Sequence, residues 1–242
     1  MVNAPVQLIT ITKGRLHHLR QTLPAMLAQE CDFDYRVVVI DYGSPDGDFD
    51  WCKGTLSDAP RSVLIARVLD DTEEFSRSRS RNIGGNLAVE GYVAFVDVDA
   101  LLSPHWLESA VRPLWQGKAA ITTPDWSRSI TPGEKGLGLC AVKAETFHAV
   151  RGFDEALRGW GYEDNDFWLR CQTFGPADHS DGAQVQILAH ELEHRVRFHA
   201  IKDLRTARQA NKQRVAQRQG PVNPAGYGLA RLQLWSNRGE QP

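Results

Sequence analysis

Apolar positions along the chain fall into two kinds of run, which predict alternating strands and helices. Short, nearly continuous runs rich in β-branched residues are typical of strands that are covered on both faces. Between the first two of these runs, leucines recur at helical spacing, which gives the order strand, helix, strand. The predicted elements are strands at residues 6–11, 37–40, 63–68 and 92–96, and helices at residues 16–27 and 77–89.

This order of elements predicts an α/β domain with a mostly parallel sheet, flanked by helices and joined by right-handed crossovers. In such sheets, ligands bind beyond the carboxyl ends of the strands. Polar residues follow directly after three of the apolar runs, namely Thr12, Asp41 and the pair Asp97 and Asp99. We therefore expect the functional site at this edge of the sheet.

Two later segments differ from this regular pattern. Residues 117–162 are rich in Gly, Pro and Trp and are expected to be irregular, and the glycine-rich part at 133–138 is a candidate lid. Residues 203–219 are helical in pattern and basic. Such a helix is usually a solvated face, but clustered cations could instead contact anionic lipid or a partner protein.

Composition narrows the classes of function. The chain has 242 residues, 42% hydrophobic and 24% charged, as in ordinary globular proteins. A net charge of −2 argues against nucleic acid as a partner. The four cysteines form no CxxC pair, which argues against a thiolate zinc cluster. With no run of about 20 apolar residues, we expect a cytoplasmic protein that could contact the inner face of the membrane through its basic helix.

The segment FVDVD at residues 95–99 places two aspartates after an apolar strand. Two like charges this close are costly unless a cation joins them. Carboxylate oxygens suit Mg²⁺ or Mn²⁺, which also bind phosphate oxygens. The alternative is a pair of solvated or capping aspartates that close the strand.

Four motifs occur in order along residues 6–170. The chain reads TITKGRLHHL at 10–19, VIDYGSPD at 39–46, SRNIG at 80–84 ahead of FVDVD, and GFDE at 152–155 ahead of GWGYEDND at 159–166. Together they resemble the GT-A glycosyltransferases, specifically family 2 and its galactosyltransferase-like relatives. The resemblance implies a GT-A (Rossmann-like) domain over residues 1–200, and we assign residues 201–242 to a basic helical C-terminal extension.

The resemblance also implies a nucleoside-diphosphate sugar as donor, with UDP as the expected nucleotide. Thr12 and Asp41 would face the pyrimidine and ribose, although turn chemistry alone could also explain Asp41. Arg81 would bind the diphosphate, because guanidinium pairs well with phosphate oxygens. Tyr42 stands where family members often carry a second acid. The implied donor-binding residues are Thr12, Arg15, Asp41, Arg81, Asn82 and Asp97.

A second acidic centre lies at Glu163 and Asp164. Sugar transfer needs a general base that takes the proton of the acceptor hydroxyl. The resemblance implies Asp164 as this base, Glu163 as a residue that orients a saccharide or glycolipid acceptor, and inversion at the sugar carbon. Trp160 offers an aromatic face for a sugar ring. The alternative is a helix N-terminus whose dipole favours these acids, and both interpretations can hold together.

The segment HELEH at 190–194 fits the zinc-protease pattern HExxH, with His190 and His194 as ligands and Glu191 as base. No third ligand follows at the usual spacing, which disfavours a metalloprotease. The resemblance implies instead that a histidine after the second acidic centre completes the metal site. The predicted Mn²⁺ or Mg²⁺ ligands are Asp99, Asp97 and His194, with His190 and His199 as alternatives to the histidine. A non-catalytic carbohydrate- or nucleotide-binding module is a further alternative, which the intact Glu163–Asp164 pair disfavours.

Overall fold

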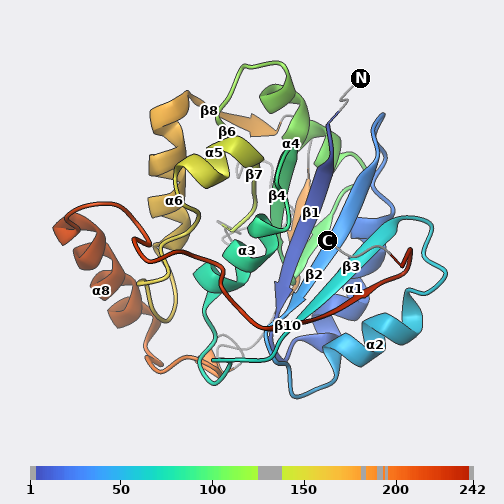
Figure 1. The fold of residues 1–242 in the computed structure, drawn as a ribbon, viewed down its shortest axis with the longest axis horizontal. Helices are drawn as coiled ribbons and strands as arrows, with labels where there is room; N and C mark the ends of the chain where they lie inside the picture. Colours follow the sequence, from blue (N-terminus) through green and yellow to red (C-terminus); the bar gives the residue numbers. More distant parts are fainter. Residues whose placement is uncertain (1–3, 125–137, 181–183, 190–192, 194–195, 240–242) are drawn as a thin grey trace.

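The protein folds as an α/β sandwich, as a computed structural model shows (Figure 1). The structure describes residues 4–124, 138–180, 184–189, 193 and 196–239. Most of the candidate lid, residues 133–137, and the residues His190, Glu191 and His194 therefore lie outside the described part of the chain. The first half contains β1 (Val6–Thr12), α1 (Leu16–Leu27), β2 (Tyr35–Asp41), α2 (Asp48–Thr55), β3 (Ser62–Val68), α3 (Arg77–Asn86), β4 (Tyr92–Asp97), β5 (Ala100–Leu102) and α4 (Trp106–Trp115).

The second half contains several short strands and also α8, which has 14 residues. Most of its elements follow the segment that we expected to be irregular, and the last strand of the chain returns to the main sheet. They are β6 (Ile121–Pro124), β7 (Cys140–Lys143), α5 (Ala144–Ala149), α6 (Glu163–Cys171), the 3₁₀ turn η2 (Gln172–Phe174), β8 (Ala177–Ser180), β9 (Val185–Ile187), α8 (Leu204–Gln217) and β10 (Leu232–Ser236).

One large sheet organises the molecule. Within the described residues it has eight strands, in the order β10-β3-β2-β1-β4-β7-β6-β8, and β5 pairs separately with β9. The four strands predicted from the sequence, β1 to β4, are parallel to one another, whereas β7 and β10 run antiparallel to their neighbours β4 and β3. The prediction of a mostly parallel sheet flanked by helices is confirmed.

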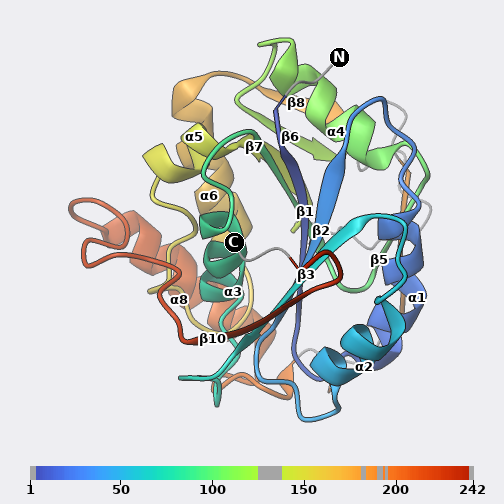
Figure 2. The same ribbon diagram turned by 45° about the vertical axis from the view of Figure 1, so that its right-hand side comes forward.

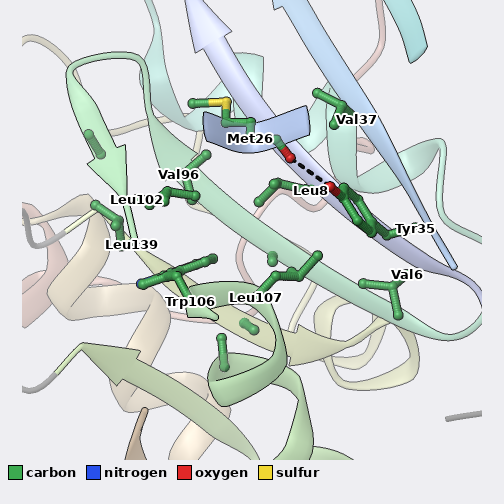
Figure 3. Close-up of a cluster of buried hydrophobic side chains, with 14 of the residues drawn as sticks. Val6, Leu8, Met26, Tyr35, Val37, Val96, Leu102, Trp106, Leu107 and Leu139 are labelled. Atoms are coloured by element: carbon green, nitrogen blue, oxygen red, sulfur yellow. Dashed lines mark hydrogen bonds between the residues drawn. The ribbon is translucent and has the colours of Figure 1, made fainter. Parts of the chain in front are cut away.

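Side chains alternate between the two faces of this sheet, as the pleat of a strand requires. On β1, Leu8 packs with α1, α2 and α4 on one face, whereas Ile9 packs with α3, α5 and α6 on the other. Figure 2 shows these two groups of helices on opposite sides of the strands. In the first layer, the Tyr35 hydroxyl donates to the Met26 carbonyl oxygen at 3.0 Å, which ties β2 to α1 (Figure 3).

The segment 117–162 contains more regular structure than its composition predicts. It includes β6, β7 and α5, and β7 pairs with β4 through residues such as Phe95 and Cys140. These elements are four to six residues long. The hydrophobic period cannot identify runs this short, since only tertiary pairing stabilises them.

The C-terminal residues also differ from the helical extension that we expected. The basic helix α8 is present, but the chain then runs past α3 to β10, which pairs antiparallel with β3 (Figures 1 and 2). The division at residue 200 stays a prediction. In the described residues, no helix is both long and apolar enough to cross a membrane.

Two helical glycines allow a matched test of this packing. A Cβ at Gly85, in α3, would overlap the ring of Phe147, whereas a Cβ at Gly54, in α2, would meet nothing. We expect Gly85→Ala to lower the free energy of unfolding by about 1–3 kcal/mol through overpacking. Gly54→Ala should instead raise it by up to about 1 kcal/mol, because alanine favours the helix. Urea denaturation of both variants measures the difference, and equal effects would contradict the described packing of α3.

Candidate active site

The polar residues predicted from strand ends lie together at one edge of the sheet. Thr12, at the end of β1, is opposite Asp41, at the end of β2, and Ile11 is opposite Asp97, at the end of β4. The parallel register of β2, β1 and β4 therefore brings three predicted site residues to neighbouring positions. Their closeness follows from topology, because all three strands end at the same edge.

A cluster of buried polar side chains lies beyond β1 and β2. The Thr12 hydroxyl and the Ser44 hydroxyl both donate to Asp48 Oδ2, and the Ser44 amide donates to Asp41 Oδ1 at 2.7 Å. Asp41 therefore stabilises the turn after β2, which is the role that turn chemistry alone predicts for it. The second carboxylate oxygens, Asp41 Oδ2 and Asp48 Oδ1, are buried without a hydrogen-bond partner among the described residues, although Asp41 Oδ2 lies 3.7 Å from Arg67 Nε.

Burial disfavours the charged form of both carboxyl groups in this cluster. It raises the pKa of Asp41, and it raises the pKa of Asp48 to about 7. A ligand that donates hydrogen bonds to the two open oxygens would offset this cost. Asp48 was missed in the sequence, where it lies in a run of turn-forming residues.

Tyr42 replaces the second acid and points elsewhere. Its side chain is buried, its hydroxyl donates to the Asp71 carbonyl oxygen at 3.2 Å, and it accepts from Arg79 Nη1 at 3.0 Å. Arg79 also pairs with Asp70 at 3.1 Å and donates to the Leu229 carbonyl oxygen. These two side chains therefore hold protein segments together.

The three arginines before Asn82 have different environments. Arg81 is almost fully buried, with 2% of its side chain exposed, and Arg79 makes the structural contacts just described. Arg77 is half-buried, and its Nη1 atom has no hydrogen-bond partner in the described part of the chain. Its positive charge acts to lower the pKa of both Asp99 and Asp164. Arg77 thus has an unbonded donor, and its charge acts on both acidic centres.

Arg81 joins the two acidic centres that the sequence predicted separately. Its Nη2 lies 2.8 Å from Asp97 Oδ1, and its Nη1 lies 2.5 Å from Asp164 Oδ1 and 3.9 Å from Glu163 Oε1. Burial alone would lower the pKa of Arg81, but Asp164, Asp97 and Glu163 raise it above its ordinary value. The guanidinium is therefore permanently charged.

Gly138 lies directly against this ion pair. A Cβ at residue 138 would overlap both Arg81 Nη2 and a carboxylate oxygen of Asp97. The backbone at the end of the candidate lid thus packs on the ion pair between Arg81 and Asp97. A larger residue at position 138 would displace this ion pair.

Asp164 and Glu163 occupy the first turn of α6. Both are buried, and no hydrogen bond from an N-cap side chain is present at this terminus, so the carboxylates lie where the helix dipole favours negative charge. Burial raises the pKa of Asp164 to about 7, although Arg81 acts to lower it. The helix-terminus interpretation and a proton-accepting role are therefore compatible.

Asp99 has the environment expected of a residue that would bind a cation. Burial, followed by the charge of Asp97, raises its pKa to about 6, while Arg15 and Arg77 act to lower it. A further positive charge beside both carboxylates would relieve this repulsion, so the pair suits a hard divalent cation. Within the described residues, no group of three or more metal-binding side chains gathers. The third predicted ligand, His194, lies outside them.

His199 is the described member of the histidine alternatives. It is buried, and it stacks on Phe75 with ring centroids 5.9 Å apart. Burial, together with the charge of Arg77, lowers its pKa to about 3, so the imidazole is neutral. Its Nδ1 has no hydrogen-bond partner among the residues that the structure describes.

Asn82, a predicted donor-binding residue, bonds to other parts of the protein. Its Nδ2 donates to the Phe153 carbonyl oxygen and to Glu155 Oε1, and its Oδ1 accepts from the Phe153 amide at 2.7 Å. With both kinds of polar atom bonded to protein, Asn82 holds the GFDE loop in place beside Arg81.

The two remaining predicted residues lie at opposite sides of this centre. Arg15 is the N-cap residue of α1, close enough to Asp99 to affect its pKa. Trp160 is half-buried in the turn before α6, between Gly159 and Gly161. The structure therefore brings Arg15 to the Asp99 side and Trp160 to the Asp164 side.

The mixed α/β fold, with its large and mostly parallel sheet flanked by helices, is that of the GT-A glycosyltransferases. The family described as Glycosyl transferase family 2 matches residues 7–139, more than half of the chain, and the N-terminal domain of galactosyltransferase matches residues 120–200. The chain therefore belongs to glycosyltransferase family 2. A comparison with curated proteins finds no match.

Solved structures share the fold. The structure of S. aureus TarS 1–349 in complex with UDP-GlcNAc has a TM-score of 0.65 at 16% identity, and covers 79% of this chain and 60% of that one. A structure of GalNAc-T7 with UDP, GalNAc and Mn²⁺ has a TM-score of 0.63 at 16% identity, and covers 77% of this chain and 44% of that one. The chain thus spans about 60% of the length of the TarS fragment.

The Arg81 bridge can be tested through pH. Replacing Arg81 with Gln leaves Asp164 buried without its cation, so its pKa should rise above the present value of about 7. At pH 8 the Asp164 carboxylate of the unaltered protein is charged and stabilised by Arg81, so the variant should lose about 3–5 kcal/mol in the free energy of unfolding. At pH 5 Asp164 is protonated in the variant, so the loss should be smaller. Urea denaturation at both pH values, with the exposed Arg205→Gln as control, measures this. A loss independent of pH would contradict the electrostatic role.

Proposed function

We propose that this protein transfers a sugar from a nucleoside-diphosphate donor to a hydroxyl group of a saccharide or glycolipid acceptor. The observation that carries the proposal is that one guanidinium group, that of Arg81, is paired with both Asp97 and Asp164. The two carboxylates therefore lie on either side of a single charged group. A group transfer needs the leaving group and the general base on either side of one reacting carbon. The two acidic centres supply these two sides.

The nucleotide would bind at the ends of β1 and β2. The open oxygens of Asp41 and Asp48 can accept hydrogen bonds from a base N–H or from ribose hydroxyls, and Thr12 positions Asp48. UDP is the nucleotide that we propose. GalNAc-T7 and TarS have been solved with UDP or UDP-GlcNAc on the same fold, which supports this choice.

The diphosphate would lie between the arginines and the aspartate pair. Arg77 offers a buried Nη1 without a partner among the described residues, and Arg15 and Arg77 both act on the charge of Asp99. Guanidinium groups are suited to phosphate oxygens because of their planar array of donors. Arg81 would contribute mainly its charge, since its donors already bond to Asp97 and Asp164.

Mn²⁺ or Mg²⁺ would be held by Asp99 and Asp97, with His194 as the third ligand and His190 and His199 as the alternatives to it. When bound, such an ion stabilises the negative charge that develops on the leaving diphosphate. The mutual repulsion that contributes to the raised pKa of Asp99 supports a cation at this place.

Asp164 would accept the proton of the acceptor hydroxyl. Its pKa of about 7 suits a general base near neutral pH, and Arg81 holds its carboxylate in a fixed orientation. Glu163 and Trp160 would orient the acceptor, the second through its aromatic face. A carboxylate base on the acceptor side favours direct displacement with inversion at the sugar carbon.

The alternatives are less well supported. The galactosyltransferase match over residues 120–200 includes the HELEH segment, which favours a glycosyltransferase role for these histidines over a zinc protease. Two carboxylates buried beside one arginine lower the free energy of unfolding through their desolvation. A module that only binds a nucleotide or carbohydrate has no need of such a pair. Contact of the exposed cations of α8 with anionic lipid stays a prediction, as do a cytoplasmic location and the absence of a nucleic-acid partner.

The role of Asp164 gives a direct test. Asp164→Asn keeps the size of the side chain but removes the base, so transfer from a UDP-sugar should fall by about 10²–10⁴-fold while UDP binding is retained. In the unaltered protein, the rate should rise with pH through about 7, because the base must be deprotonated. Release of UDP measures both effects, with the exposed Asp58→Asn as control. Unchanged turnover in Asp164→Asn would remove Asp164 from this role.

Donor and metal binding can be tested without knowledge of the acceptor. At a ligand concentration of 100 times Kd, UDP with Mn²⁺ should stabilise the fold by about 2.7 kcal/mol and raise Tm by about 5–10 °C. Asp99→Asn should abolish the part of the shift that depends on Mn²⁺. A UDP-induced shift that is the same with EDTA and with Mn²⁺ would show that no metal takes part in donor binding.

A further inference from the structure

The basic helix α8 lies outside both family matches and yet contacts the acceptor side of the proposed site. Those matches end at residues 139 and 200, and α8 begins at Leu204. A Cβ at Gly159 would meet Ala207, and a Cβ at Gly161 would meet the side chain of Arg208. The helix therefore packs on the turn that leads into Glu163 and Asp164.

This packing is polar, which is unusual for a helix that supports a site. The buried residues of α8 are Ala207 and Asn211, and most of its other side chains are exposed. Hydrophobic contacts are non-directional, whereas hydrogen bonds and ion pairs depend on distance and angle. A helix fixed by polar contacts therefore sets the position of its partner more narrowly than an apolar face of the same size.

Asn211 makes the central contacts. Its Nδ2 donates to the carbonyl oxygens of Gly161 at 2.8 Å and of Arg158 at 2.9 Å, and its Oδ1 accepts from the Arg158 amide at 3.1 Å. A single amide side chain thus fixes both ends of the segment that holds Trp160. Asn211 itself is only 5% exposed.

Arg218, at the end of α8, fixes the other side of the same loop system. Its Nη2 lies 2.7 Å from Asp166 Oδ1, and its Nη1 lies 2.9 Å from Asp154 Oδ2. Asp166 also pairs with Arg170 at 2.8 Å, and both aspartates are buried. Arg218 therefore ties the first turn of α6, which contains Asp164, to the GFDE loop.

The turn needs such support because its backbone is not in a relaxed conformation. Gly159, Gly161 and Tyr162 all have positive φ, with 77° at Tyr162, a conformation that non-glycine residues rarely adopt. Asp164 lies two residues after Tyr162, so a change in this turn would move its carboxylate.

We propose that Asn211 and Arg218 are positioning residues, which set the acceptor-side turn and through it the carboxylate of Asp164. This inference rests on the proposed function, since it assigns a purpose to the orientation of the base. The two residues act through backbone carbonyls and through Asp154 and Asp166, and they do not touch the reacting groups.

Two variants test the proposal in the full chain. Asn211→Asp keeps the acceptor for the Arg158 amide but loses both donated bonds, and Arg218→Met loses both ion pairs. We expect release of UDP from a UDP-sugar to fall at least about 10-fold in kcat, because small displacements of reacting groups are costly. The Kd for UDP with Mn²⁺ should stay within about 2-fold. Amides of residues 158–166 should exchange hydrogen at least about 10-fold faster, while those of β1 and β2 do not change.

Lys212→Ala, on the exposed side of α8, is the matched control and should change none of these quantities. If Asn211→Asp does not fold, the milder change Asn211→Ser is measured in its place against the same control. Unchanged kcat and exchange in the positioning variants would overturn the inference, and so would a parallel loss of UDP affinity and kcat. If the unaltered chain releases UDP from no nucleotide sugar, the proposed function fails, whereas the exchange measurement still decides whether α8 holds the turn.

Discussion

The guanidinium of Arg81 pairs with carboxylates from two distant parts of the chain, Asp97 at the end of β4 and Asp164 at the start of α6. A buried charge is tolerated only when it is paired and hydrogen-bonded, so the two elements have to meet at a fixed distance. Other features follow from this requirement. The backbone of Gly138 packs directly on the ion pair, and the ring of Phe153 lies 5.1 Å from the guanidinium carbon.

The charges around Arg81 also explain why acids and arginines gather at this edge of the sheet. Asp97, Glu163 and Asp164 outnumber the cation that they surround, and Asp99 lies close enough to Asp97 to be repelled by it. The raised pKa values of Asp99 and Asp164 reflect this excess of negative charge, although burial is the larger cause. A divalent cation and an anionic diphosphate that enter together would change the net charge of the site little. Arg15 and Arg77 lie on the side where the anion would be expected.

The parallel core and the ends of its strands could be predicted because their signals are local. Apolar runs identify β1 to β4, and an acid after such a run marks the edge where ligands bind. The roles of the alternating arginines could not be separated in this way, since Arg77, Arg79 and Arg81 have similar neighbours in sequence. Only the fold directs Arg79 to Tyr42 and Arg81 to Asp164. Asn82 likewise looks like a motif residue, and its bonds to Phe153 cross 71 residues.

The late position of α8 in the chain has a consequence for the order of events during synthesis. The core strands β1 to β4 are complete by Asp97, so much of the sheet can form early, as domains fold from the N-terminus during translation. The contacts that fix the turn before α6 come 50 residues after Gly161 and 52 after Asp166. A nascent chain would therefore have folded the proposed nucleotide-binding half well before the contacts that orient Asp164, the proposed base, can form.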